Sequence, residues 1–88
     1  MQSYTVDLAG VRRIDELHDR LGEGLRLPDW YGRNLDALFD HLTEMEGQLF
    51  IDGIEEIDED LKPYVDRFRA VLQDAKEANP LIQIVIGS

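Results

Sequence analysis

Three short β-forming runs, separated by helical patterns, leave this chain a narrow choice of folds. The runs are residues 4–8, 48–52 and 81–86, and each is rich in branched aliphatic or aromatic residues. Strands that alternate with helices form a parallel sheet through right-handed crossovers. A chain of 88 residues has room for one core. We therefore predict one α/β domain, residues 1–88, with a three-stranded parallel sheet, residues 48–52 in its centre, and three to four helices.

Three segments have apolar residues at helical spacing. The first covers residues 14–27 and has His18 on its apolar face, where a hydrogen-bonded core histidine is expected. The second covers residues 35–46 and stops before a glycine. The third covers residues 63–78, with proline in its first turn and Asn-Pro after its end. The acidic residues 55–60 are expected to form a loop or one helical turn, and the third β-forming run is expected to be buried.

Residues 27–40 contain the most unusual local pattern. A proline, the adjacent aromatics Trp30 and Tyr31, and Gly32 directly precede the second helix. Gly32 permits a backbone conformation that other residues reach at a cost, and Asn34 is a good N-cap. We expect one of the two aromatics to anchor the loop in the core and the other to offer aromatic area to a partner. Their spacing leaves open which does which.

Asp36 and Asp40 form a charge pair for which the fold gives no reason. They are four residues apart, so they lie on one side of the helix, away from its apolar face. Such a pair repels by about 0.2–0.5 kcal/mol, and no lysine or arginine three or four residues from Asp40 within the helix relieves it. A local cost without a local structural reason indicates a functional role.

Catalytic and metal-binding interpretations of these carboxylates are less favoured. An acid/base pair needs a carboxyl group in surroundings that raise its pKa, whereas both aspartates are expected to be exposed. A metal site made of Asp36, Asp40 and Glu44 would draw all its ligands from one face of a helix. Hard cations take about six or more oxygen ligands, usually from a loop. His41 points about 100° away from its neighbour Asp40, so the two form no dyad. Glycine-rich phosphate loops are absent, and we predict neither enzyme activity, nor a cofactor, nor a metal.

The charge balance favours a basic partner. Nineteen acidic residues against nine basic ones give a formal charge of −10. Nucleic acid and anionic membranes would repel such a chain, whereas a basic protein would attract it. Alternatively, the acidity only keeps a small protein soluble. The lack of cysteine excludes disulfides and thiolate metal sites. With no leader-like or membrane-spanning segment recognised, we expect a cytoplasmic monomer.

A basic, concave, anion-binding site, such as a ribonuclease cleft, fits exposed aspartates beside aromatic residues best. Residues 27–40 closely resemble the signature of the barstar family, intracellular inhibitors of barnase-type ribonucleases. The likeness extends to residues 16–18, 42–43 and 75–76 and to the C-terminal strand, so it covers essentially the whole chain. It implies a three-stranded parallel sheet with helices. It also implies that the second helix and the loop before it plug the active site of the nuclease.

The resemblance assigns roles to particular residues. Asp40 would be the main mimic of an RNA phosphate, Asp36 its partner, and Trp30 a loop aromatic packed on the enzyme. Thr43 and Asp74 would be peripheral contacts. The predicted contact set also includes Tyr31, Gly32 and Asn34.

Trp30 and Phe39 stand where other aromatics are usual, the loop of residues 46–48 lacks a proline, and two further departures from the family pattern change the charge. Arg33 carries a positive charge where an acid is expected, so it would oppose a basic partner or pair with an acid on it. Glu44 replaces a small residue and adds charge at the end of the helix. Two alternatives remain open: an acidic regulatory module that docks a basic protein other than a nuclease, and an immunity protein for a toxin nuclease.

Overall fold

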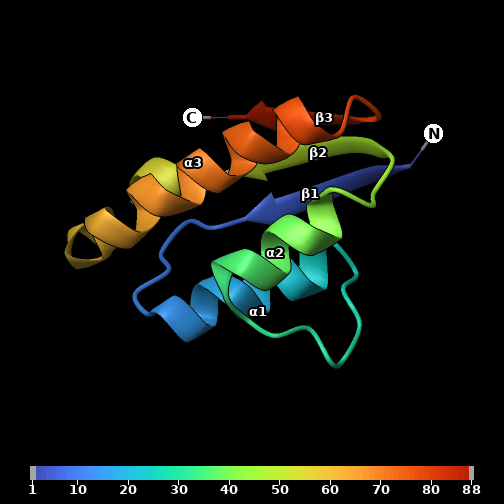
Figure 1. The fold of residues 1–88 in the computed structure, drawn as a ribbon. Helices are drawn as coiled ribbons and strands as arrows, with labels where there is room; N and C mark the ends of the chain where they lie inside the picture. The colour runs from blue at the N-terminus through green and yellow to red at the C-terminus, as the bar shows by residue number, and fades with distance from the viewer. Residues whose placement is uncertain (1, 88) are drawn as a thin grey trace.

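The computed structural model describes residues 2–87 and has the predicted α/β fold (Figure 1). The elements within these residues are β1 (Ser3–Asp7), α1 (Ile14–Gly24), α2 (Leu35–Leu42), β2 (Gly47–Asp52), η1 (Ile54–Glu56), η2 (Glu59–Leu61), α3 (Lys62–Ala78) and β3 (Ile82–Ile86). The short η1 and η2 are 3-10 helices, so the acidic segment forms two turns where we expected a loop or a single turn. No helix of the described part has the length and apolarity that crossing a bilayer requires.

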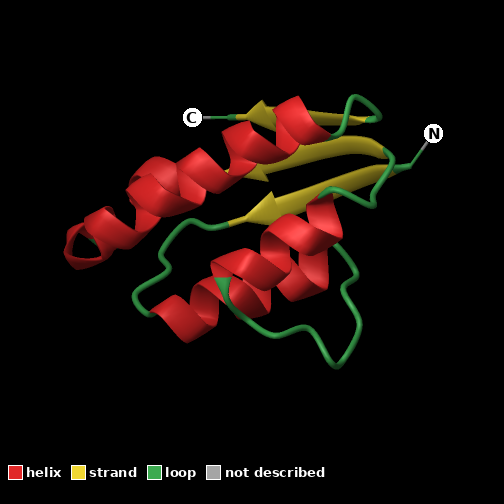
Figure 2. Ribbon diagram, in the orientation of Figure 1, coloured by secondary structure: helices red, strands yellow, loops and turns green. Residues whose placement is uncertain are grey.

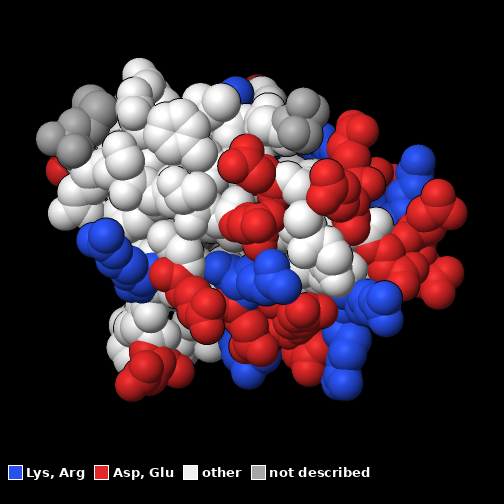
Figure 3. All heavy atoms as spheres, turned by 180° about the vertical axis from the view of Figure 1, so that it is seen from behind, with Lys and Arg blue, Asp and Glu red and all other residues white. Residues whose placement is uncertain are grey.

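The sheet is parallel, with the strand order β1-β2-β3 and β2 in the centre, as predicted (Figure 2). In this register Leu49 of β2 pairs with Tyr4 of β1 and with Ile84 of β3. In Figure 1, α3 crosses one face of the sheet; α1 packs against β1, and α2 packs against α3. Seen from behind, the part of the surface over the sheet carries few charged atoms (Figure 3). Charge is therefore concentrated on the helices and loops.

The prediction that residues 81–86 are buried is confirmed for Ile82 and Ile84 and is wrong for the other four, of which Leu81 is 61% exposed. Ile82 and Ile84 face the core, but Val85 and Ile86 are 48% and 43% exposed. Gln83 and Val85 lie on the face of the strand opposite to that of Ile82 and Ile84, whereas Ile86 shares the inner face but is the last residue of the strand. An uninterrupted apolar run in the sequence suggested burial on both faces, but the face that carries Gln83 and Val85 is exposed.

A closely packed glycine ends α1, whereas α2 ends before the glycine that was expected to stop it. α1 ends at Gly24, where an added Cβ would lie 2.6 Å from the carbonyl oxygen of Thr5, so only glycine lets the helix approach β1 this closely. α2 ends at Leu42, four residues earlier than the sequence suggested. Gly47 begins β2 with a positive φ of 126° and does not end the helix. Four residues thus link α2 to β2 directly.

Candidate functional site

The N-terminus of α2 is fixed by Asn34. Its Oδ1 accepts a hydrogen bond of 2.7 Å from the backbone N–H of Ala37, and its Nδ2 donates to the carbonyl oxygen of Gly32 at 3.1 Å. The predicted N-cap is therefore present. Leu35 and Leu38 are buried, which orients the helix. With its apolar side held in the core, α2 directs its polar side outward.

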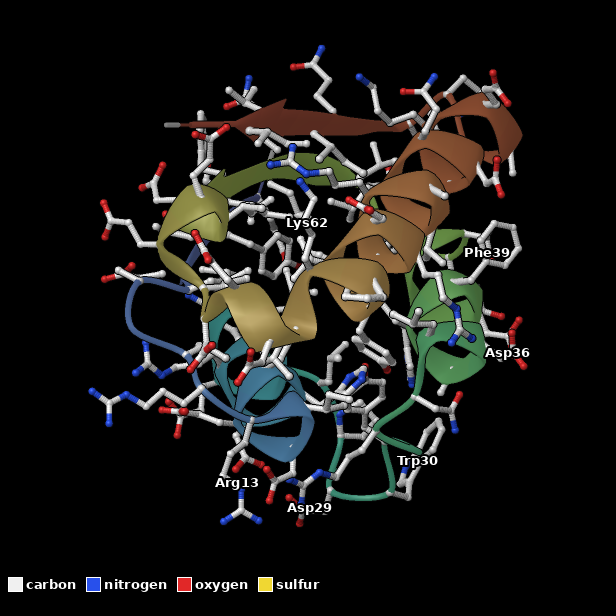
Figure 4. All side chains as sticks on the ribbon, turned by 90° about the vertical axis from the view of Figure 1, so that its left-hand side faces the viewer. Arg13, Asp29, Trp30, Asp36, Phe39 and Lys62 are labelled. Carbon is white, nitrogen blue, oxygen red and sulfur yellow. The ribbon has the colours of Figure 1, made fainter. Side chains whose placement is uncertain are left out.

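Asp36 and Asp40 lie on that outward side. Both side chains are exposed, and neither forms an ion pair with any residue between 2 and 87. Figure 4 shows the carboxylate of Asp36 projecting from the same side of the molecule as Trp30 and Phe39. Asp36 also stands in the first turn, where the helix dipole favours a negative charge. The intramolecular repulsion that the sequence indicated is therefore left uncompensated.

The structure buries one of the two loop aromatics and exposes the other. Tyr31 is 7% exposed and belongs to the core, whereas Trp30 is 76% exposed. The rings of both lie against His41 of α2, with centroid distances of 5.3 Å for Trp30 and 5.6 Å for Tyr31. The exposed indole therefore stands next to the helix that carries the two aspartates.

A buried histidine ties the loop to two helices. His18 of α1 is 1% exposed, its Nδ1 lies 2.7 Å from the hydroxyl of Tyr31, and its Nε2 lies 2.7 Å from the hydroxyl of Tyr64 on α3. The prediction of a hydrogen-bonded core histidine is confirmed. Tyr64 was expected only as part of an apolar stripe, and its spacing gives no sign of the partner 46 residues away. Burial, and the nearby Arg33 guanidinium, lower the pKa of His18, while Asp19 partly opposes this.

We expect the free energy of unfolding to fall as the pH is lowered below about 6.5, the ordinary pKa of histidine. Because the pKa of folded His18 is lowered, the unfolded chain binds the proton first. The contribution of His18 to the free energy of unfolding is complete above about pH 6.5. It is lost as the pH falls towards the pKa of His18 in the folded protein. Urea unfolding between about pH 7.5 and 5.5 should show this loss in the wild type and much less of it in His18→Gln, which cannot titrate. Parallel pH curves for the two proteins would contradict the assignment.

Arg33 is directed at the protein's own α1. Its guanidinium forms an ion pair of 2.6 Å with Asp19 and donates a hydrogen bond of 3.0 Å to the carbonyl oxygen of Asp15. These contacts within the protein account for the positive charge of Arg33. A contact with the partner, whether repulsive or with an acid there, stays a prediction. Arg33 also holds the positive φ, 55°, that we expected at Gly32. Gly32 matters for space instead, since an added Cβ would lie 3.2 Å from that of Ala37.

The C-terminus of α2 is held by a buried amide that the sequence did not single out. Asn79, just after α3, is 6% exposed, and its Nδ2 donates to the carbonyl oxygens of Leu42 at 2.9 Å and Met45 at 2.7 Å. Thr43 closes the helix, with its Oγ1 donating to the carbonyl oxygen of Asp40 at 2.8 Å. An Asn-Pro pair indicates the end of a helix. Nothing in the sequence indicated that Asn79 also binds the C-terminal end of α2.

The remaining predicted residues lie apart from these contacts. Asp74 is exposed on α3, the helix that packs on α2, and Glu44 is exposed just beyond α2. Residues 2–87 contain no group of three or more histidine or acidic side chains placed to hold a metal ion. Of the open hollows on the described surface, one lies beside η1, η2 and α3 and another at the amino ends of the strands, and neither of these is lined by Asp36 or Asp40. The two aspartates thus stand outside both hollows.

Comparison with known proteins identifies the family of this chain. The family model described as "Barstar (barnase inhibitor)" matches residues 1–86. A protein of Bacillus subtilis (strain 168), named "Putative ribonuclease inhibitor YrdF", is 38% identical over 80 residues, which cover 88% of each chain. The match thus includes α2, the loop before it and the whole sheet. This chain belongs to the barstar family.

Proposed function

We propose that this protein inhibits a basic, barnase-type ribonuclease by inserting α2 and the preceding loop into its active site. The observation that carries the proposal is the pair of exposed carboxylates, Asp36 and Asp40, which find no cation within residues 2–87. In the complex, Asp40 occupies the position of an RNA phosphate and Asp36 supports it. Arginine and lysine side chains that bind phosphate also bind carboxylates, Arg through paired hydrogen bonds.

The surroundings of the two carboxylates support the proposal. Trp30 adds an exposed aromatic surface beside them, and exposed aromatic residues are frequent at the centres of protein interfaces. Asn34 fixes one end of α2, and Asn79 fixes the other. A rigid surface loses little conformational entropy on binding. No catalytic step is part of the proposal, because the protein acts by occupying the site.

The direct test is a titration of ribonuclease activity. A purified barnase-type ribonuclease cleaving a fluorogenic oligonucleotide should lose its activity in proportion to added protein, with an end point at one inhibitor per enzyme. A competition experiment should show that the substrate and the inhibitor exclude each other. Full RNA cleavage at a saturating excess of inhibitor would refute the proposal for that class of enzyme. Binding without inhibition would favour an acidic regulatory module.

Association with the ribonuclease should slow steeply as salt is added. The protein has a formal charge of −10, and the proposed partner is basic. Long-range attraction between the two proteins speeds their encounter. Raising the ionic strength from about 0.01 M to about 0.15 M shortens the Debye length from about 30 Å to about 8 Å. Stopped-flow association rates should therefore fall about tenfold or more, while dissociation rates change much less. An association rate that is independent of salt would contradict the role of charge.

A further inference from the structure

The indole of Trp30 is exposed but not free. It is the most exposed large apolar side chain of the described residues, at 76%, and its ring centroid lies 5.3 Å from that of His41, with the planes tilted by 40°. Aromatic rings attract each other at centroid distances of about 4.5–7 Å. His41 belongs to the last turn of α2, next to Asp40 in the sequence. The contact therefore joins the loop to the helix at the charged site.

His41 packs in turn on Tyr31, which belongs to the core. Its ring lies 5.6 Å from that of Tyr31, edge to face at 72°, and the hydroxyl of Tyr31 is bonded to the buried His18. A buried ring, a half-buried ring and an exposed ring thus follow one another from the core to the surface. The imidazole of His41 forms no hydrogen bond or ion pair within the described part of the chain. The ring of His41 packs between its two aromatic neighbours, Trp30 and Tyr31.

We propose that His41 is a positioning residue that holds the Trp30 indole against α2, so that loop and helix meet the partner as one rigid surface. Without the imidazole, the indole would move independently of α2 and would have to be ordered when the partner binds. That ordering reduces affinity, by about 3- to 10-fold for one large side chain. The proposal is a statement about the free protein. Its consequence for binding rests on the proposed ribonuclease inhibition.

The first test uses the free protein, because Trp30 is the sole tryptophan of the chain. In His41→Ala, the anisotropy decay of tryptophan fluorescence should gain a fast local component, and acrylamide should quench the emission more strongly. His41→Phe restores an aromatic contact and should return both values towards those of the wild type. Glu23→Ala, at an exposed position of α1, is the control. Equal tryptophan mobility in wild type and His41→Ala would overturn the proposal.

The second test uses a barnase-type ribonuclease. His41→Ala should raise Kd about 3- to 10-fold, and His41→Phe should recover most of the loss. In a Trp30→Ala background, His41→Ala should have no further effect, because the side chain it positions is gone. An equal loss with and without Trp30 would overturn the proposal. If the wild type binds no such ribonuclease, the proposed function fails, while the anisotropy of the free protein still decides whether His41 positions Trp30.

Discussion

Replacing Asp40 with alanine is expected to weaken ribonuclease binding by about 2 kcal/mol or more, which is about 30-fold or more in Kd. The exposed carboxylate has no partner within residues 2–87, so its electrostatic interaction becomes available in the complex. In the proposed complex, its removal would also leave a cation of the enzyme without its partner, which would add to the cost. The barstar–barnase complex is itself the reference case for effects of this size, so the magnitude is carried over through family membership.

The same substitution should leave the fold intact. The side chain of Asp40 forms no hydrogen bond or ion pair within the described residues, and its loss removes the repulsion from Asp36. The free energy of unfolding should stay within about 0.5 kcal/mol of the wild type or rise by a few tenths. Binding calorimetry and urea unfolding of Asp40→Ala, Asp36→Ala and the control Glu23→Ala separate the two effects. We expect the loss of affinity to be largest for Asp40, smaller for Asp36 and negligible for Glu23. An affinity of Asp40→Ala within about threefold of the wild type would remove phosphate mimicry by this residue.

Replacing Asn79 with alanine is expected to destabilise the protein by about 2–4 kcal/mol. The substitution removes two hydrogen bonds to the carbonyl oxygens of Leu42 and Met45, and a third in which the Asn79 Oδ1 accepts from the backbone N–H of Leu81 at 3.0 Å. A buried polar group left without its partner costs about 1–3 kcal/mol. Far-UV circular dichroism during urea unfolding measures the change.

The chain contains a matched control, because its other asparagine, Asn34, has an exposed side chain. Asn34→Ala removes an N-cap and should cost about 1 kcal/mol. Asn79→Asp keeps the shape and the bond to Leu81 but turns a carboxylate towards two carbonyl oxygens, so at neutral pH it should destabilise at least as much as alanine. If Asn79→Ala destabilised the protein less than Asn34→Ala, the amide would not be what holds the end of α2.

Local rules predicted the fold well where the determinants are close in sequence. The periodicity of the strands and helices gave the parallel three-stranded sheet, and Asn34 marked the start of α2 because a cap depends on residues a few positions away. The end of α2 was placed too late because the pattern of apolar residues continues to Met45, where the chain is no longer helical. Val85 and Ile86 were misjudged because a run of apolar residues does not reveal that one face of a strand is exposed or that the core ends before the last residue of the strand.

The sequence predicted the charged residues of the candidate site but not the buried residues that hold its loop and helix in place. The spacing of Asp36 and Asp40 alone signalled an unrelieved charge pair, and both side chains are exposed. The contacts of His18 with Tyr64 and of Asn79 with Leu42 join residues 46 and 37 positions apart, and no local pattern encodes such distances. Trp30 and Tyr31 are adjacent, so only the folded backbone decides which ring turns inward.

The division of labour along the chain has a consequence for how such proteins diversify. The groups nearest the proposed interface fall within one uninterrupted stretch, from Trp30 to Thr43, while the anchors His18, Tyr64 and Asn79 belong to other segments. Exchanging a few outward-facing side chains in that stretch leaves every anchor in place. If α2 and its loop form the interface, substitutions within this one segment would suffice to change the target. The rest of the sequence could then stay the same.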